Sequence, residues 1–132
     1  MKTTLNKLLI PRMLGKVNTM KIYNYQDLEA QEAEEGASKT TVRWLITKEM
    51  GAKNFAMRLF EIGVGGYSPY HSHSWEHEVF ILEGEGLAIE KEEQKQFKAG
   101  DVIFIPQNEK HQFRNNGKKN VKFLCLIPYT HK

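Results

Sequence analysis

The chain has 132 residues, of which 40% are hydrophobic and 27% are charged, as is ordinary for one soluble globular domain. No apolar run approaches the roughly 18 residues that a membrane helix needs, so no membrane partner is expected. The single cysteine, Cys125, excludes an intramolecular disulfide and fits the reducing conditions of a cytoplasmic location.

The formal net charge of +3 is distributed unevenly along the chain. Residues 1–20 contain four basic residues and no acidic residue, whereas the rest of the chain contains 15 basic and 16 acidic residues. The body of the protein is therefore nearly neutral. Nucleic acid is not expected as a partner, because its binding depends on clustered Lys and Arg side chains.

Residues 1–20 form a basic leader ahead of a predicted domain at residues 21–132. The short apolar stretch of the leader is interrupted by Pro11 and Arg12, which argues against a secretory signal. Met20 begins a segment that reads like a natural start. The leader is therefore either an extension ahead of that start or an extra N-terminal strand that packs on a partner subunit.

The remaining chain predicts strands almost throughout. Residues 27–35 show a weak helical period but are polar on all sides, which is typical of a solvated turn. From residue 40 onward, β-type runs alternate with Gly, Pro and Asn turns, and these runs span residues 40–48, 54–64, 77–84, 86–92, 95–100, 101–106, 111–115 and 121–128. Short runs at this spacing predict an all-β sandwich or barrel. The segment NNGKKN at residues 115–120 predicts a hairpin turn, because Asn and Gly tolerate positive φ.

Four of the five histidines fall in two places in the sequence. His71 and His73 are two residues apart, so on an extended strand both imidazoles face the same side. His77 opens the next predicted strand, and His111 lies 34 residues further on. The fifth histidine, His131, lies in the C-terminal tail and is expected to have no function.

The first histidine cluster stands inside a gapped motif. Gly65 is followed by five residues, then His71, Ser72, His73, three residues, His77, six residues and Gly84. This stretch resembles the first signature of the cupin superfamily, G-x5-H-x-H-x3,4-E-x6-G. The position of the glutamate in that signature is occupied by His77.

His111 stands inside a second gapped motif. Gly100 is followed by five residues, then Pro106, Gln107, Asn108, two residues, His111, three residues and Asn115. This stretch resembles the second cupin signature, G-x5-P-x-G-x2-H-x3-N. Asn108 replaces one glycine, a mild change because Asn also adopts the left-handed conformation. The two resemblances imply an all-β fold consisting of a single cupin barrel, the double-stranded β-helix or jelly roll.

Glu78 is an alternative to His77 as a metal ligand, because a spacing of four residues in the first signature places the glutamate there. Two arguments favour His77. The count of six residues back from Gly84 ends on His77, and neighbouring strand residues point to opposite faces of the sheet. The sequence therefore predicts the ligand set His71, His73, His77 and His111.

The chain is closely similar to the small single-domain bacterial cupins that bind manganese through four histidines. The stretch PYHSHSWEHEVFILEGE carries this resemblance, which extends over residues 23–128. It implies one octahedral divalent metal ion per chain, with manganese favoured and two positions left open. An all-nitrogen ligand set also suits Fe, Ni, Cu or Zn. The resemblance further implies a homodimer.

The resemblance implies a metal-dependent oxidoreductase or dioxygenase-type enzyme that acts on a small organic molecule. Neither signature supplies a further acid or base, so the ion would carry most of the chemistry. Two alternatives remain at this point. One is a non-redox isomerase or lyase for a small sugar acid, with the metal as Lewis acid. The other is a module that binds a small molecule without turnover.

Two residues are candidates for catalysis, Arg58 and Cys125. Arg58 lies in an otherwise apolar run. If its side chain faces the interior, it would hold an anionic substrate group or a bound oxygen species. If it faces outward, it would contact solvent or another subunit. Cys125 would be a redox-sensitive thiol near the metal. Cys125, Phe123 and Ile127 share one strand face and match cavity positions of the four-histidine relatives, and Phe113 lies two residues after His111. These side chains form either an apolar substrate pocket or ordinary core.

Overall fold

The computed structural model describes residues 18–129, so most of the leader predicted at residues 1–20 lies outside the described residues, as does His131. Within this range, strands are joined by short loops and two 3-10 helices. The elements in chain order are η1(Tyr25–Asp27), β1(Gln31–Glu32), β2(Ser38–Ile46), η2(Lys48–Met50), β3(Phe55–Tyr67), β4(His77–Glu83), β5(Glu85–Glu90), β6(Glu93–Lys98), β7(Val102–Ile105), β8(His111–Arg114) and β9(Val121–Pro128).

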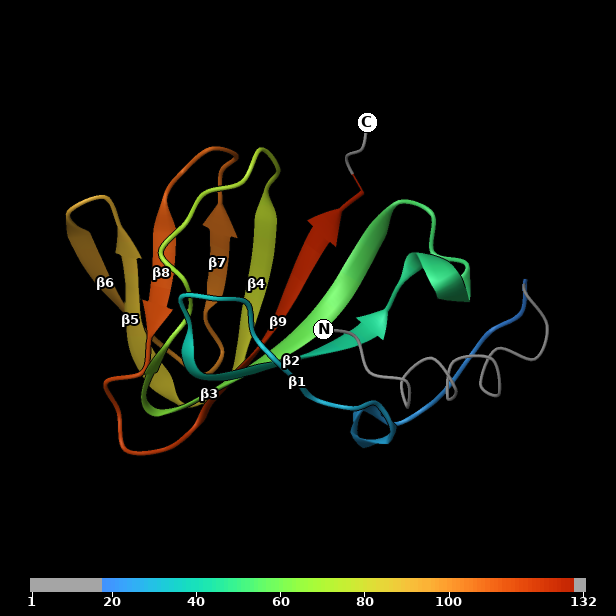
Figure 1. Ribbon diagram of the computed structural model, residues 1–132, viewed down its shortest axis with the longest axis horizontal. Coiled ribbons are helices and arrows are strands. Elements are labelled where there is room, and N and C mark those ends of the chain that lie inside the picture. Colours follow the sequence, from blue (N-terminus) through green and yellow to red (C-terminus); the bar gives the residue numbers. More distant parts are fainter. Residues whose placement is uncertain (1–17, 130–132) are drawn as a thin grey trace.

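The strands form one antiparallel sheet with the order β6-β5-β8-β3-β9-β4-β7, and β2 pairs with β3 while β1 pairs with β2. Figure 1 shows the curled sheet, with β6 and β5 on one side of the view and β2 toward the other. The all-β barrel that the short runs predict is therefore confirmed. No helix in residues 18–129 has the length and hydropathy of a membrane span.

Alternation along the strands places the core inside the curl. In β4, Val79 and Ile81 are 2% and 0% exposed, while the residues between and after them face outward. In β9, Val121, Phe123 and Cys125 are buried in the same way. This period of two is the signature of a sheet with one apolar face turned to a core.

The hairpin predicted at residues 115–120 is wrong. β8 and β9 are not neighbours in the sheet, because β3 lies between them and pairs with both. The connection is instead tied to β3 through the buried Asn115. Its Nδ2 donates to the carbonyl of Ile62 at 2.8 Å and to that of Lys119 at 2.9 Å, and its Oδ1 accepts from the N–H of Gly117 at 2.9 Å.

Four motif positions adopt positive φ: Gly65, Gly84, Gly100 and Asn108. Asn108 has φ 67°, which confirms that this Asn takes the conformation of the glycine it replaces. Gly84 has φ 87°, and a Cβ at this position would lie 2.5 Å from the carbonyl oxygen of Asn120. The turn between β4 and β5 therefore needs glycine both for its backbone conformation and for its close approach to the neighbouring chain.

The acidic segment at residues 27–35 contains no helix after Asp27, which ends η1, but the solvated turn predicted for it is wrong, because Leu28 is 1% exposed. Part of it is ordered as β1, which pairs with β2 so that Gln31 lies opposite Val42. This pairing carries the following residues, including Glu34, across the open end of the barrel. The segment thus takes part in the site described next.

Candidate metal centre and its pocket

The four histidines come from two stretches of the chain, residues 71–77 and His111, which the sheet brings together. His71 and His73 lie in the loop between β3 and β4, His77 opens β4, and His111 opens β8. The loop is fixed by a two-way bridge in which the His71 N–H donates to the His111 carbonyl at 3.1 Å and the His111 N–H donates to the His71 carbonyl at 2.9 Å. The N–H of Asn108 also donates to the carbonyl of His73.

The imidazole rings form one group. Their centroids are separated by 4.3 Å for His71 and His73, 5.1 Å for His71 and His111, 5.2 Å for His73 and His77, 4.9 Å for His77 and His111, and 6.3 Å for His73 and His111. Imidazoles that bind one ion at about 2.1 Å have centroids roughly 4.6 Å apart at right angles and roughly 6.5 Å apart when opposite. The ring spacing is therefore that of ligands to one ion.

The donor atoms of the four histidines do not converge on a common point. In residues 18–129, no group of three or more His, Cys, Asp or Glu side chains has its donor atoms already arranged to hold a metal ion. The Nδ1 atom of His77 is buried and has no hydrogen-bond partner, although a buried ring nitrogen ordinarily has one. Four imidazoles that line one pocket are nonetheless a set of nitrogen ligands that divalent transition metals prefer, so the residue types present are suited to such an ion.

Two of the rings are oriented by hydrogen bonds from the nitrogen on the Cγ side. His71 Nδ1 lies 2.8 Å from a carboxylate oxygen of Glu34, and His111 Nδ1 lies 2.9 Å from the carbonyl oxygen of Glu109. With Nδ1–H as the donor in each pair, Nε2 carries the free lone pair. Partners of this kind fix the tautomer and ring direction of metal-binding histidines.

Burial keeps at least three of the imidazoles neutral. Desolvation lowers the pKa of His77 to about 3 and that of His73 to about 4, with smaller contributions from neighbouring imidazoles and from Arg58. Desolvation also lowers the pKa of His111, against a hydrogen bond to Glu109 that raises it. Neutral imidazole is the form that binds a metal, so these rings need not lose a proton at pH 7.

His77 and Glu78 point to opposite sides of β4. His77 is 5% exposed and lines the pocket with the other three histidines, whereas Glu78 is exposed on the outer face of the sheet. Trp75, in the loop before them, stacks on His73 with ring centroids 4.4 Å apart and planes 7° apart. This stacking holds the loop against the ring, as expected for a packing role of the tryptophan.

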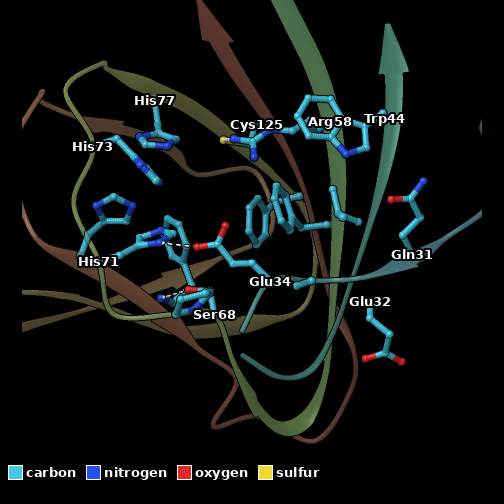
Figure 2. A pocket seen from close by; sticks show the side chains of 17 residues that line it. Gln31, Glu32, Glu34, Trp44, Arg58, Ser68, His71, His73, His77 and Cys125 are labelled. Carbon is cyan, nitrogen blue, oxygen red and sulfur yellow. Dashed lines mark hydrogen bonds and ion pairs between the residues drawn. The ribbon is translucent and has the colours of Figure 1, made fainter. Parts of the chain in front are cut away.

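A cavity of about 320 Å³ adjoins the imidazoles. Figure 2 shows His71, His73 and His77 on one side of it, Trp44, Arg58 and Cys125 on another, and the Glu34 carboxylate reaching in between. The volume is at the small end of the usual range for ligand pockets. Aromatic rings make up much of the wall: Trp44, Phe60, Phe113 and Phe123.

Most of the predicted pocket residues line this cavity, but Ile127 does not. Arg58, Phe113, Phe123 and Cys125 are all on its wall. Ile127 shares the inward face of β9 but packs against the core cluster. The reason is its place in the register, because β4 pairs with β9 only as far as Leu126, and Ile127 lies opposite Ala56 beyond the reach of β4.

Several wall residues were not predicted from the sequence. Trp44 had a signal, because it alternates with Val42, and both line the cavity. No sequence signal indicated Glu34, because its segment is typical of a solvated turn and its partner His71 is 37 residues away. Ser68 also lines the cavity, and its hydroxyl accepts from the N–H of Phe113 at 2.8 Å.

The fold and the site define a small antiparallel β-barrel with an imidazole cluster at the mouth of an aromatic pocket. The family model described as "Cupin_2: Cupin domain" matches residues 58–127, which contain all four histidines. The chain therefore belongs to the Cupin_2 family of cupin domains.

Curated relatives with different activities resemble the chain. It is 35% identical over 71 residues to the 1-methylthio-D-xylulose 5-phosphate methylsulfurylase of Rhodospirillum rubrum, covering 54% of this chain and 46% of that protein. It is 32% identical over 96 residues to the oxalate-binding protein of Thermotoga maritima, covering 70% and 78%. The chain spans about half the length of the methylsulfurylase and of an uncharacterized protein of Methanocaldococcus jannaschii that it also matches.

A solved structure supports the same family. The polyketide cyclase RemF from Streptomyces resistomycificus superposes with a TM-score of 0.78 at 34% sequence identity, covering 83% of this chain and 80% of that one. The names of these relatives include a cyclase, a binding protein and a methylsulfurylase. The functions that these names state differ from one relative to the next.

Proposed function

We propose that the chain is a metal-dependent enzyme that holds one divalent transition metal ion, manganese in the first place, through His71, His73, His77 and His111. The small organic substrate occupies the adjoining cavity, and the reaction is of the oxidoreductase or dioxygenase type. The observation that carries the proposal is the gathering of four imidazoles from two stretches of the chain at one end of an aromatic pocket.

The fold keeps the proposed ligand residues in the protonation state and orientation that a cation requires. The neutral state of His73, His77 and His111 leaves lone pairs available, and the bonds to Glu34 and to the Glu109 carbonyl aim two rings. A bound ion supplies Lewis-acid polarisation of a substrate oxygen or one-electron chemistry. Glu34 adds a carboxylate beside the ligand set, which the sequence motifs do not supply.

Cys125 serves in this proposal as part of the pocket wall. It is 3% exposed, and burial raises the pKa of its thiol, against a smaller lowering by Arg58. The thiol is therefore protonated at pH 7, which makes it a poor nucleophile and a slow target of oxidants. Its Sγ lies 3.1 Å from an Nη atom of Arg58 and helps to fix that side chain.

Elemental analysis of the purified protein tests the metal site. We expect about one manganese or iron atom per chain, and His71→Ala or His111→Ala should remove both the metal and turnover. His131→Ala, which removes the fifth histidine of the sequence, is the matched control and should keep the metal. Full metal content in both site variants would contradict the ligand assignment.

A non-redox reaction is the second candidate, favoured by the names of the relatives, since a cyclase and a methylsulfurylase stand among them. Here the ion acts as a Lewis acid on a small sugar acid or a related substrate. The two candidates differ in their response to a redox-inert ion. Activity that survives replacement of the native metal by zinc favours the second candidate, whereas loss of activity with retained zinc binding favours the first.

We further propose that the enzyme is cytoplasmic and works as a homodimer. Large apolar side chains on the outer face of β4 and β7 support the dimer, with Val102 76% exposed and Phe104 56% exposed. β7 lies at one end of the sheet order. A second copy would cover this face.

A further inference from the structure

Arg58 lines the pocket on a different side from His71, His73 and His77. It lies on β3, directly opposite Trp44 on β2 and Cys125 on β9 in the registers of the sheet. Residues directly opposite one another in antiparallel strands project from the same face. All three therefore point into the barrel, and Figure 2 shows the Arg58 guanidinium beside Cys125 at the edge of the pocket.

The guanidinium is held by apolar and weakly polar groups. Its carbon lies 4.8 Å from the ring centroid of Phe60 and 5.4 Å from that of Trp44, and one Nη atom donates to the Cys125 sulfur at 3.1 Å. The Nε atom is buried without a hydrogen-bond partner. In the described part of the chain, no carboxylate lies within ion-pair distance of Arg58, although other basic residues have such partners.

Arg43 on the neighbouring strand shows the contrast. Its Nε donates to the carbonyl of Leu28 at 2.9 Å, and it pairs with Glu61 at 3.4 Å. A partly buried positive charge without such partners is unfavourable, because aromatic rings and one sulfur replace the removed water less well than oxygen acceptors would. A ligand that supplies hydrogen-bond acceptors to the Arg58 guanidinium would offset this unfavourable free energy.

We propose that Arg58 binds the carboxylate of a small, flat, apolar carboxylic acid, whose body lies along the aromatic wall and whose other end faces the histidines. A planar guanidinium matches a carboxylate in geometry and charge. The wall of Trp44, Phe60 and Phe123 suits an unsaturated or aromatic body, and Phe60 and Phe123 stack with centroids 5.2 Å apart. The inference rests on the proposed function in that it takes this cavity as the substrate site.

The cavity favours a monocarboxylate over a phosphate ester. Arg58 is the single basic side chain on the cavity wall besides the imidazoles, and no lysine lines it within residues 18–129. A phosphate dianion ordinarily calls for more donors or a helix N-terminus. The volume of about 320 Å³ limits the body of the acid to a small molecule.

Calorimetric titration of metal-free protein with benzoate and with its uncharged analogue benzamide tests the proposal. We expect benzoate to bind the natural protein about tenfold or more tightly than benzamide, since a charge-assisted pair contributes about 1.5–3 kcal/mol. Arg58→Gln should bring the two affinities within about twofold. Arg58→Lys keeps the charge without the planar fork, so its preference for benzoate should be intermediate.

Arg114→Gln is the matched control, because it removes the same charge from an exposed arginine that stacks on Tyr67 outside the cavity. It should retain the full preference for benzoate. Equal affinities of the natural protein for benzoate and benzamide would overturn the proposal, as would an undiminished preference in Arg58→Gln and Arg58→Lys. The titrations use metal-free protein, so their result is independent of whether the metal and the reaction are assigned correctly.

Discussion

His71 and Glu34 form a contact in the site that no pattern in the sequence indicates. The imidazole and the carboxylate lie 2.8 Å apart, and the Glu34 side chain is 60% exposed. In water such a pair contributes little to folding stability. Its value lies in orienting a ligand ring, because a carboxylate on Nδ1–H makes Nε2 a stronger donor to a cation.

Glu34→Gln should therefore weaken metal binding about tenfold or more while leaving the fold intact. Manganese affinity can be measured by titration of metal-free protein. Glu32→Gln is the control, since Glu32 also lines the cavity but lies in β1 and makes no contact with a histidine in the described structure. Equal affinities for both variants would show that the Glu34 contact does not position the ligand.

Asn115 makes a second prediction at this scale, on stability. Its two amide hydrogens are directed at the carbonyls of Ile62 and Lys119 in a site that is 3% exposed. Asn115→Asp places a carboxylate against two acceptors and should lower the free energy of unfolding by about 2 kcal/mol or more. Asn116→Asp, at an exposed neighbour, should change it by less than about 0.5 kcal/mol in the same denaturant titration.

Among the elements, strands β2, β3 and β9 decide what faces the cavity. Their registers place Trp44, Arg58 and Cys125 in one row. A shift of one residue in any of them would turn its member of the row outward. The connection between β4 and β5 at Gly84 is also constrained, because it packs against the backbone of Asn120 and Val121 at the start of β9.

Gly84→Ala tests this turn against Gly100→Ala. Both glycines have positive φ, 87° and 95°, so both alanines are strained. At Gly84 the added Cβ also meets the Asn120 carbonyl oxygen at 2.5 Å, whereas at Gly100 nothing lies within 4 Å. Gly84→Ala should therefore lower the unfolding free energy by more than about 1 kcal/mol beyond Gly100→Ala. Equal losses of unfolding free energy in the two variants would mean that the backbone around Gly84 accommodates the added Cβ without further destabilisation.

For the whole molecule, the outer face of β4 and β7 makes the homodimer testable. Four large apolar side chains are exposed there: Phe80, Leu82, Val102 and Phe104. Light scattering should give twice the 15.3 kDa mass of one chain. Val102→Lys should shift the mass toward one chain, because a lysine in a buried apolar contact is costly.

Val64→Lys is the matched control for the dimer. Val64 is 47% exposed but lies on β3 near the loop that follows β8, away from β7. It should leave the mass at two chains. A mass of one chain for the natural protein would refute the proposed dimer.

The sequence by itself determined the fold class and the inward faces of the strands. The alternation of apolar residues along a strand, as in Val79 and Ile81 or in Phe123 and Cys125, is a local property of the sequence. These alternating residues are the ones that are buried. The spacing of the histidines likewise predicted which four imidazoles lie together. It matches two signatures of a family whose fold brings these positions close to one another. Asn108 could be assigned its left-handed conformation for a similar local reason.

Only the tertiary structure decided which distant segments complete the site. It inserted β3 between β8 and β9, where the turn residues at 115–120 had favoured a hairpin. It brought Glu34 to His71 and placed Ile127 beyond the cavity. Each of these outcomes depends on pairing between strands far apart in the chain, for which neither turn propensity nor alternation carries a signal.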